Sequence, residues 1–175
     1  MAVTLSGGAP TFTVGYQGGT IISGTAQAST SGTSIDFTSI PSWVKRITVT
    51  IAGVSTNGSS DWGIKLGTSG GIVSTGYAGG IGNTGGGSQT PTTIAQAVYT
   101  ATSAAVSSGT ITISLANSST NQWTIAGSLA QTGFTYAGMI CGYSVSLSGA
   151  LTQVRITTVN GTDTFDAGSI NILYE

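Results

Sequence analysis

The sequence predicts an all-β fold, an antiparallel β-sandwich of jelly-roll-like form. The first observation behind this prediction is that apolar residues alternate with Thr, Ser, Gly or Ala at a period of two in nearly every segment. Such alternation is typical of antiparallel strands with one buried face and one wet face. The second is that clusters of Gly, Ser and Asn interrupt these segments at short intervals, as turns do in a sandwich. The predicted inward-facing residues are Phe12, Val14 and Tyr16; Ile47, Val49 and Ile51; Trp62, Ile64 and Leu66; Ile111, Ile113 and Leu115; Trp123, Ile125 and Leu129; and Ile170, Ile172 and Tyr174.

The first thirty residues differ in composition from the rest of the chain. Residues 1–30 are rich in Gly, Thr and Ser and contain no charged residue. We interpret them either as an attachment arm or as the first strands of the sandwich, and residues 31–175 as the β-sandwich domain. Helix has little support: the Ala-rich segment 94–106 also contains Thr, Tyr and Val, so it is interpreted as a strand followed by a loop.

Two Asn-Gly pairs predict β-hairpins. Type I′ turns need positive φ at both central residues, and Asn and Gly tolerate this conformation best. The pair Asn57-Gly58 lies between the predicted strands 47–54 and 61–67. A tight hairpin is therefore expected there.

The second pair, at 160–161, fixes a register for a C-terminal hairpin. With a two-residue turn, Ile156 lies opposite Phe165 on the buried side of the sheet. Arg155 then lies opposite Asp166 on the other side, where opposite charges stabilise a strand pair. Arg155 and Asp166 are therefore predicted to form a structural pair.

Two further segments have local interpretations. The glycine-rich segment 79–90 reads GGIGNTGGGSQT and is interpreted as a long mobile loop between strands. Cys141 is the only cysteine in the chain. Because it shares an alternating face with Met139 and Tyr143, it is interpreted as a buried, inert thiol.

The charge content limits the classes of partner. Only 5% of the residues are charged and the net charge is -1, against about 25% charged residues in an ordinary soluble domain. A surface so poor in charge suits a protein fixed in an assembly. The basic pair Lys45-Arg46 is too small to hold a phosphate backbone, so no nucleic-acid partner is predicted. No window contains the ~20 consecutive apolar residues of a membrane helix, so no membrane insertion is predicted.

The composition also argues against an enzyme. The chain has no His, the commonest general base and transition-metal ligand. Among the five carboxylates, Asp163 and Asp166 lie beyond a predicted turn, where Asp is an ordinary turn residue. The sequence GIGNTG at 80–85 has the form of a dinucleotide fingerprint but lacks the helix and acidic residue that should follow. No catalytic residue, no cofactor and no metal site are predicted.

Aromatic residues near predicted loops are the remaining signal for binding, because an aromatic ring offers an apolar face on which a sugar can stack. Alternation assigns Trp62 and Trp123 to the core. Tyr77 precedes the glycine-rich segment, and Tyr136 also lies near a predicted loop. Tyr77 and Tyr136 are therefore the candidate contacts for a host surface glycan.

Two long segments carry a resemblance to a known family: SIDFTSIPSWVKRITVTIAGVSTNG at 34–58 and LTQVRITTVNGTDTFDAGSINILYE at 151–175. They resemble fibre proteins and related virion-surface proteins of tailed bacteriophages, and LGTSGGI at 66–72 fits the middle of the same family. The resemblance implies a β-sandwich displayed on the phage particle as a homotrimer, and it transfers no binding residue. A trimer also has a physical motive, since the strand edges of this chain have few charges to protect them.

These observations lead to one main hypothesis and three alternatives. The main hypothesis is a non-enzymatic, fibre-type structural protein of a tailed-phage virion, made in the host cytoplasm and displayed on the particle surface. Its expected partners are other copies of itself, tail or capsid proteins, and a host surface glycan. The short chain favours a capsid decoration or head-fibre protein as the first alternative. A free carbohydrate-binding module and a glycan-cleaving depolymerase are the other two.

Overall fold

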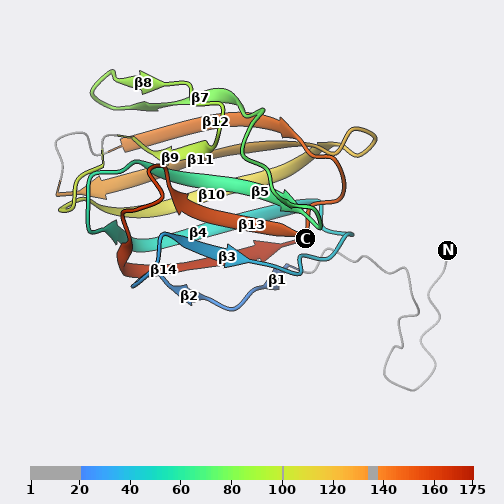
Figure 1. Cartoon of the computed structure of the whole chain (residues 1–175), viewed down its shortest axis with the longest axis horizontal. Helices are drawn as coiled ribbons and strands as arrows, with labels where there is room; N and C mark the ends of the chain where they lie inside the picture. The colour runs from blue at the N-terminus through green and yellow to red at the C-terminus, as the bar shows by residue number, and fades with distance from the viewer. Residues whose placement is uncertain (1–20, 100, 134–137) are drawn as a thin grey trace, which may run out of the picture.

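The structure, a computed structural model, describes residues 21–99, 101–133 and 138–175. Over this part of the chain it is all-β, and its strands form two antiparallel sheets without any helix (Figure 1). The described chain therefore contains no helix of the length and apolarity that a membrane span requires. The predicted fold class is confirmed at this level. The expected strand around Phe12, Val14 and Tyr16 lies outside the described residues.

The larger sheet has the strand order β1-β14-β4-β10-β11-β12-β7-β8, and β2 also pairs with β14. Its long central strands alternate buried and exposed residues, as the sequence predicts. The strand bounds are β1 Ile22–Ser23, β2 Gln27–Ala28, β4 Arg46–Thr56, β7 Ala78–Asn83, β8 Ser88–Gln89, β10 Val106–Asn117, β11 Gln122–Thr132, β12 Gly138–Ser146 and β14 Phe165–Tyr174.

The smaller sheet has the order β3-β13-β5-β6, and β9 pairs with β5. Its bounds are β3 Ser34–Phe37, β5 Trp62–Thr68, β6 Gly71–Ile72, β9 Ala95–Val98 and β13 Gln153–Thr158. The strand at β9, followed by a loop up to β10, confirms the interpretation of segment 94–106.

The connections combine local and long-range pairing. Strands β10, β11 and β12 form an up-and-down meander. This meander brings β12 back beside β7, after the chain has passed through β8 and β9. A meander that returns beside an earlier strand is a Greek-key arrangement.

One hydrophobic core lies between the two sheets. Trp62 and Trp123 are buried in it, which confirms their predicted place, and Trp62 meets Phe165 edge to face at a ring distance of 6.0 Å. Cys141 is buried too, as expected. Its desolvation raises the pKa of the thiol to about 11, so the reactive thiolate is scarce at neutral pH.

Both predicted Asn-Gly hairpins are wrong. Strand β4 lies in the larger sheet and β5 in the smaller one, so Asn57-Gly58 carries the chain from one sheet to the other. The same holds for β13 and β14 around residues 160–161. Among the described residues other than Gly, positive φ occurs at Ser39 and Asn121, not at either of these asparagines. A type I′ turn is therefore absent at both sites.

The two asparagines instead use their side chains as hydrogen-bond acceptors. Oδ1 of Asn57 accepts the backbone N–H of Thr164 at 2.9 Å. Oδ1 of Asn160 accepts the N–H groups of Thr162 and Asp163, both at 3.0 Å. The Asn160 contacts form an Asx-type turn, in which the side chain stands in for a backbone carbonyl, whereas the Asn57 contact joins two loops that are 107 positions apart in the chain. The two loops consequently pack against each other at one end of the sandwich.

The glycine-rich segment 79–90 is also different from the prediction. It contains the β7–β8 hairpin, in which Ile81 and Gly82 pair with Gln89 and Ser88. The turn is closed by a backbone hydrogen bond from Asn83 to Gly87 at 3.0 Å, so the segment is ordered by pairing rather than being a loop. In the first thirty residues, β1 and β2 pair with β14, and residues 1–20 lie outside the described chain.

Candidate functional site

The outer face of the smaller sheet carries a row of charged side chains. Strands β3, β13 and β5 lie side by side, and their register places Asp36 opposite Arg155 and Arg155 opposite Lys65. Their neighbours along each strand point into the core. Because side chains alternate along a strand, these three groups share the outer face.

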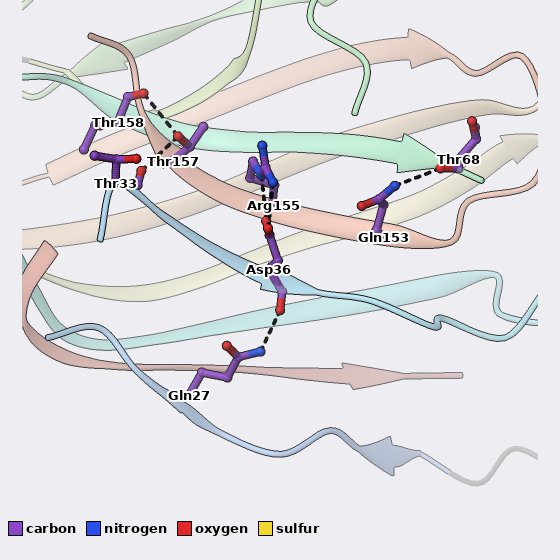
Figure 2. Close-up of polar contacts among 8 residues, drawn as sticks. All are labelled: Gln27, Thr33, Asp36, Thr68, Gln153, Arg155, Thr157 and Thr158. Atoms are coloured by element: carbon purple, nitrogen blue, oxygen red, sulfur yellow. Dashed lines mark hydrogen bonds and ion pairs between the residues drawn. The ribbon is translucent and has the colours of Figure 1, made fainter. Parts of the chain in front are cut away.

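Asp36 and Arg155 form a two-pronged ion pair (Figure 2). Nε of Arg155 lies 2.7 Å from Oδ1 of Asp36, and Nη2 of Arg155 lies 2.7 Å from Oδ2 of Asp36. These hydrogen bonds raise the pKa of Arg155 above its usual value. The side chains are 36% and 33% exposed, so water screens the pair and limits its contribution to stability.

The predicted pair of Arg155 with Asp166 is therefore wrong. Arg155 lies in the smaller sheet and Asp166 in the larger one, where the carboxylate of Asp166 accepts a hydrogen bond from the hydroxyl of Ser55. Ile156 likewise pairs across the sheet with Ile35 and Ile64 rather than with Phe165. The error follows directly from the assumed hairpin, because the strand next to Arg155 comes from a distant part of the chain.

Amide and hydroxyl side chains surround the ion pair and tie neighbouring strands together (Figure 2). Nε2 of Gln27 donates to the backbone carbonyl of Asp36 at 2.8 Å and so links the edge of the larger sheet to the smaller one. Nε2 of Gln153 donates to the carbonyl of Thr68 at 2.8 Å. The ion pair and the two glutamines around it are consequently all partnered within the chain.

A pocket of about 250 Å³ opens beside Gln27 and Asp36. Its walls come from the segment between β1 and β2, from the end of β3 and from β14. Ser39, in its wall, adopts a φ of 60°, which is uncommon for a residue other than Gly and often marks a functional position. The lining also includes Tyr174, whose ring lies 5.9 Å from that of Trp43. An aromatic ring beside hydroxyl, amide and carboxylate groups suits a polyhydroxy ligand.

Of the two predicted glycan contacts, only Tyr77 lies in the part of the chain that the structure describes, and it does not line this pocket. Tyr77 is 1% exposed, so its prediction as a surface contact is wrong. Its hydroxyl accepts the N–H of Leu66 at 2.7 Å and donates to the carbonyl of Val73 at 3.1 Å, which allows the polar tip to be buried. Burial raises the pKa of Tyr77 to about 12. Tyr136 lies outside the described residues.

The carboxylates at the loop end of the sandwich are held by structural hydrogen bonds. Asp61 accepts from Nε2 of Gln96 at 2.7 Å and from the backbone N–H of Ala101 at 3.2 Å. Asp163 accepts from the N–H of Ser60 at 2.8 Å. The pKa of Asp163 is lowered, first by its hydrogen bond with the Asn160 side chain and then by that N–H. In the part of the chain that the structure describes, no three His, Cys, Asp or Glu side chains gather as metal ligands would.

The nine charged residues occupy only one side of the molecule. The sequence contains no charged residue between Lys65 and Arg155, and strands β6 to β12 all lie in that interval. We call residues 66–154 the charge-free half, and residues 21–65 and 155–175 the charged half. In the larger sheet, β10, β11, β12, β7 and β8 are consecutive neighbours (Figure 1). In the smaller sheet, β6 and β9 pair with the edge of β5 that faces away from β13.

The gathering of the charged residues in one half of the molecule was not predicted from the sequence. The positions of the nine charges are visible in the sequence, but only the sheet order turns a gap along the chain into a continuous surface. No protein-family model, curated protein or solved structure matches this chain. The family suggested by the segments 34–58 and 151–175 is therefore a proposal for this chain.

Proposed function

We propose that the protein is a non-enzymatic structural component of a tailed-phage virion, a fibre-type β-sandwich displayed on the particle as a homotrimer. The observation that carries the proposal is the separation of the molecule into a charged half and a charge-free half. The cores of protein interfaces are depleted in charged residues. A large surface without charge is thus suited to permanent contact within an assembly, and a charged one to contact with water.

The architecture supports the same assignment. The two antiparallel sheets with a Greek-key return are the elements from which jelly rolls are built, so we assign the domain as jelly-roll-like. The segments 34–58 and 151–175, which resemble phage fibre proteins, contain all nine charged residues apart from Asp61 and Lys65. In this assignment the charged half faces away from the assembly.

The contacts of the carboxylates support a role without catalysis. Asp36 is paired with Arg155, and Glu175 with Arg46. Asp61, Asp163 and Asp166 accept hydrogen bonds from loop backbone or side chains. A carboxylate that acts as acid or base must reach a substrate in a cleft. Asp36 lines the pocket, but both of its oxygens accept hydrogen bonds from Arg155, and the other carboxylates connect segments of the fold.

Immunogold electron microscopy tests the virion assignment. An antibody raised against the purified chain is expected to label intact particles of the phage that encodes it. Label confined to the soluble fraction of the lysate, with bare particles, would overturn the assignment. Incubation with bacterial polysaccharides provides a second test, and cleavage that is lost in Asp163→Asn or Asp166→Asn would contradict a non-enzymatic role.

A carbohydrate-binding module is a second candidate function, favoured by the pocket beside Asp36. Arg155 offsets the charge of Asp36, which suits a neutral sugar better than an acidic one. An NMR titration with neutral hexoses and N-acetylhexosamines tests this function. The chemical shifts of Gln27 and Tyr174 report binding in the pocket. Saturable shifts that vanish in Gln27→Ala would support binding, whereas unchanged spectra would exclude this function for the pocket.

A further inference from the structure

The charge-free half exposes a broad face of small, uncharged residues. On the outside of β10, β11 and β12, register aligns Thr112 with Ala126 and Ala126 with Gly142. The next row aligns Thr110 with Ser128 and Ser128 with Ile140. The side chain of Ile140 is 71% exposed, and it is the large apolar group on this face. We call these six residues the β10–β12 face.

The same half exposes a second patch at the end of the larger sheet. The β7–β8 hairpin occupies this end, and its turn and its short strand β8 are exposed at Thr84, Gly86, Ser88 and Gln89. Native sheet edges are commonly protected by charged side chains, and this hairpin has none. The β7–β8 hairpin is therefore open to contact with another uncharged surface.

We propose that these two patches form the contact between copies in the homotrimer, with the β7–β8 hairpin of one copy against the β10–β12 face of the next. This inference rests on the trimer of the proposed function. A closed ring of three needs heterologous contacts, in which two different patches of each copy meet. The charge-free half supplies both patches, whereas face-to-face pairing of a single patch would give a dimer.

The chemistry of the two patches favours a second copy of this chain as the occupant. Removing a charge from water carries a large cost unless it is paired, and neither patch contains a charge. Burial of Ile140 favours the contact, because apolar area leaves water. A strongly charged partner would find no counter-charge on this half of the molecule.

The β10–β12 face is broad enough to receive the hairpin of another copy. At about 3.4 Å per residue and 4.8 Å between strands, its three strands cover roughly 500 Å². A standard interface buries about 800 Å² on each partner, so one such contact is smaller than that standard. In a closed ring each copy takes part in two of these contacts, and ring closure therefore adds to the stability of the trimer.

Placing one charge on each half tests the location of the contact. Ser128→Lys puts an ammonium group on the β10–β12 face, and Ser169→Lys puts the same group on β14 in the charged half. Both serines are exposed. Light scattering is expected to give three times 17.3 kDa for the wild type and for Ser169→Lys. Ser128→Lys is expected to shift to monomer, with at least a tenfold weaker association and an unchanged circular dichroism spectrum.

A charge rescue tests the pairing of hairpin and face. Gln89→Glu, added to Ser128→Lys, is expected to restore the trimer, because the two new charges meet across the contact. Gln89→Lys with Ser128→Lys serves as the matched control and should remain monomeric. Restoration by both double variants, or by neither, would overturn the pairing of these two patches.

The remaining outcomes separate the inference from the proposed function. A trimeric wild type with a trimeric Ser128→Lys variant would overturn the inference and leave the trimer intact. A wild type that is monomeric at every concentration would overturn the trimer and this contact with it, while immunogold labelling would still decide the virion assignment. A dimeric wild type that Ser128→Lys dissociates would overturn the hairpin contact in favour of face-to-face pairing.

Discussion

The charged half and the charge-free half share one hydrophobic core but carry different side chains on their outer faces. In the charged half, Asp36, Arg155 and Lys65 form a row on the outside of a sheet. In the charge-free half, the equivalent outward positions are Thr, Ser, Ala and Gly, with Ile140 exposed among them. The backbone ladders are alike in both halves. Strands thus pair in the charge-free half without any charged side chain, and in the proposed trimer this half forms the contact between copies.

The first test asks whether the two halves are one cooperative unit. Trp62 lies on β5 in the charged half and Trp123 on β11 in the charge-free half, and both are buried in the common core. Trp62→Ala and Trp123→Ala are each expected to lower the free energy of unfolding by about 3–5 kcal/mol. Urea unfolding, followed by circular dichroism at fixed protein concentration, should retain a single transition in both variants.

Trp123→Phe provides the matched control for that test. The indole N–H of Trp123 is buried without a hydrogen-bond partner, so Phe removes an unsatisfied donor while keeping most of the apolar contact. Its cost is expected to be well below that of Trp123→Ala. Two separate transitions in any of these variants would contradict a core shared by the halves.

The second test addresses close packing inside the charge-free half. A Cβ atom at Gly127 would lie 2.5 Å from the carbonyl oxygen of Thr110, whereas a Cβ at Gly142 would meet nothing within 4 Å. Gly127→Ala is expected to destabilise the protein by about 1–3 kcal/mol through overpacking. Gly142→Ala should be neutral, or stabilise the fold by up to about 1 kcal/mol. Equal unfolding midpoints for the two variants would show that β10 and β11 do not approach this closely.

The third test addresses the ion pair of the charged half. Arg155→Met is expected to cost about 0.5–1 kcal/mol at low salt, because the pair is partly exposed. The loss should shrink in about 1 M salt, where screening reaches within ~3 Å. Lys65→Met removes a charge from the same row, and Lys65 takes part in neither of the two ion pairs found among the described residues. If both variants lose the same stability, the contact between Arg155 and Asp36 contributes nothing specific.

The smallest expected effect is the pH dependence conferred by Asp163. Its pKa is lower in the folded chain than the usual 3.8, so ionisation of this group favours the folded state. That stability is fully present above the unfolded pKa and is lost as the pH falls through the folded pKa. The difference in melting temperature between wild type and Asp163→Asn should therefore shrink as the pH is lowered from about 5 to about 2.5. A constant difference across that range would exclude the linkage.

The sequence was informative about which residues face inward. A period of two identified the buried positions Ile47, Val49, Ile125 and Ile170 directly, because burial of one sheet face leaves that pattern in every strand. The same pattern is identical for strands of either sheet. It therefore could not reveal that β4 and β5, although adjacent in the chain, belong to different sheets.

The candidate site depended on partners that local sequence does not encode. Arg155 is next to Asp36 because β13 pairs with β3. The sequence around either residue contains no signal that predicts this pairing. The burial of Tyr77 required the N–H of Leu66 and the carbonyl of Val73 to meet its hydroxyl. The hydroxyl of Tyr77 finds these hydrogen-bond partners only once the core has assembled.

The pairing of strands that are distant in the chain affects the order in which parts of the fold form. The meander β10–β12 joins neighbours in the chain and can close within microseconds, as isolated hairpins do. The contact between Asp36 and Arg155 joins residues separated by 119 positions, and that between Thr50 and Asn171 spans 121. Such separations slow folding. We therefore expect the β10–β12 face to form before the charged half closes around the core. In the proposed trimer, copies that meet too early would then associate through the proposed contact face while the rest of each chain is still incomplete.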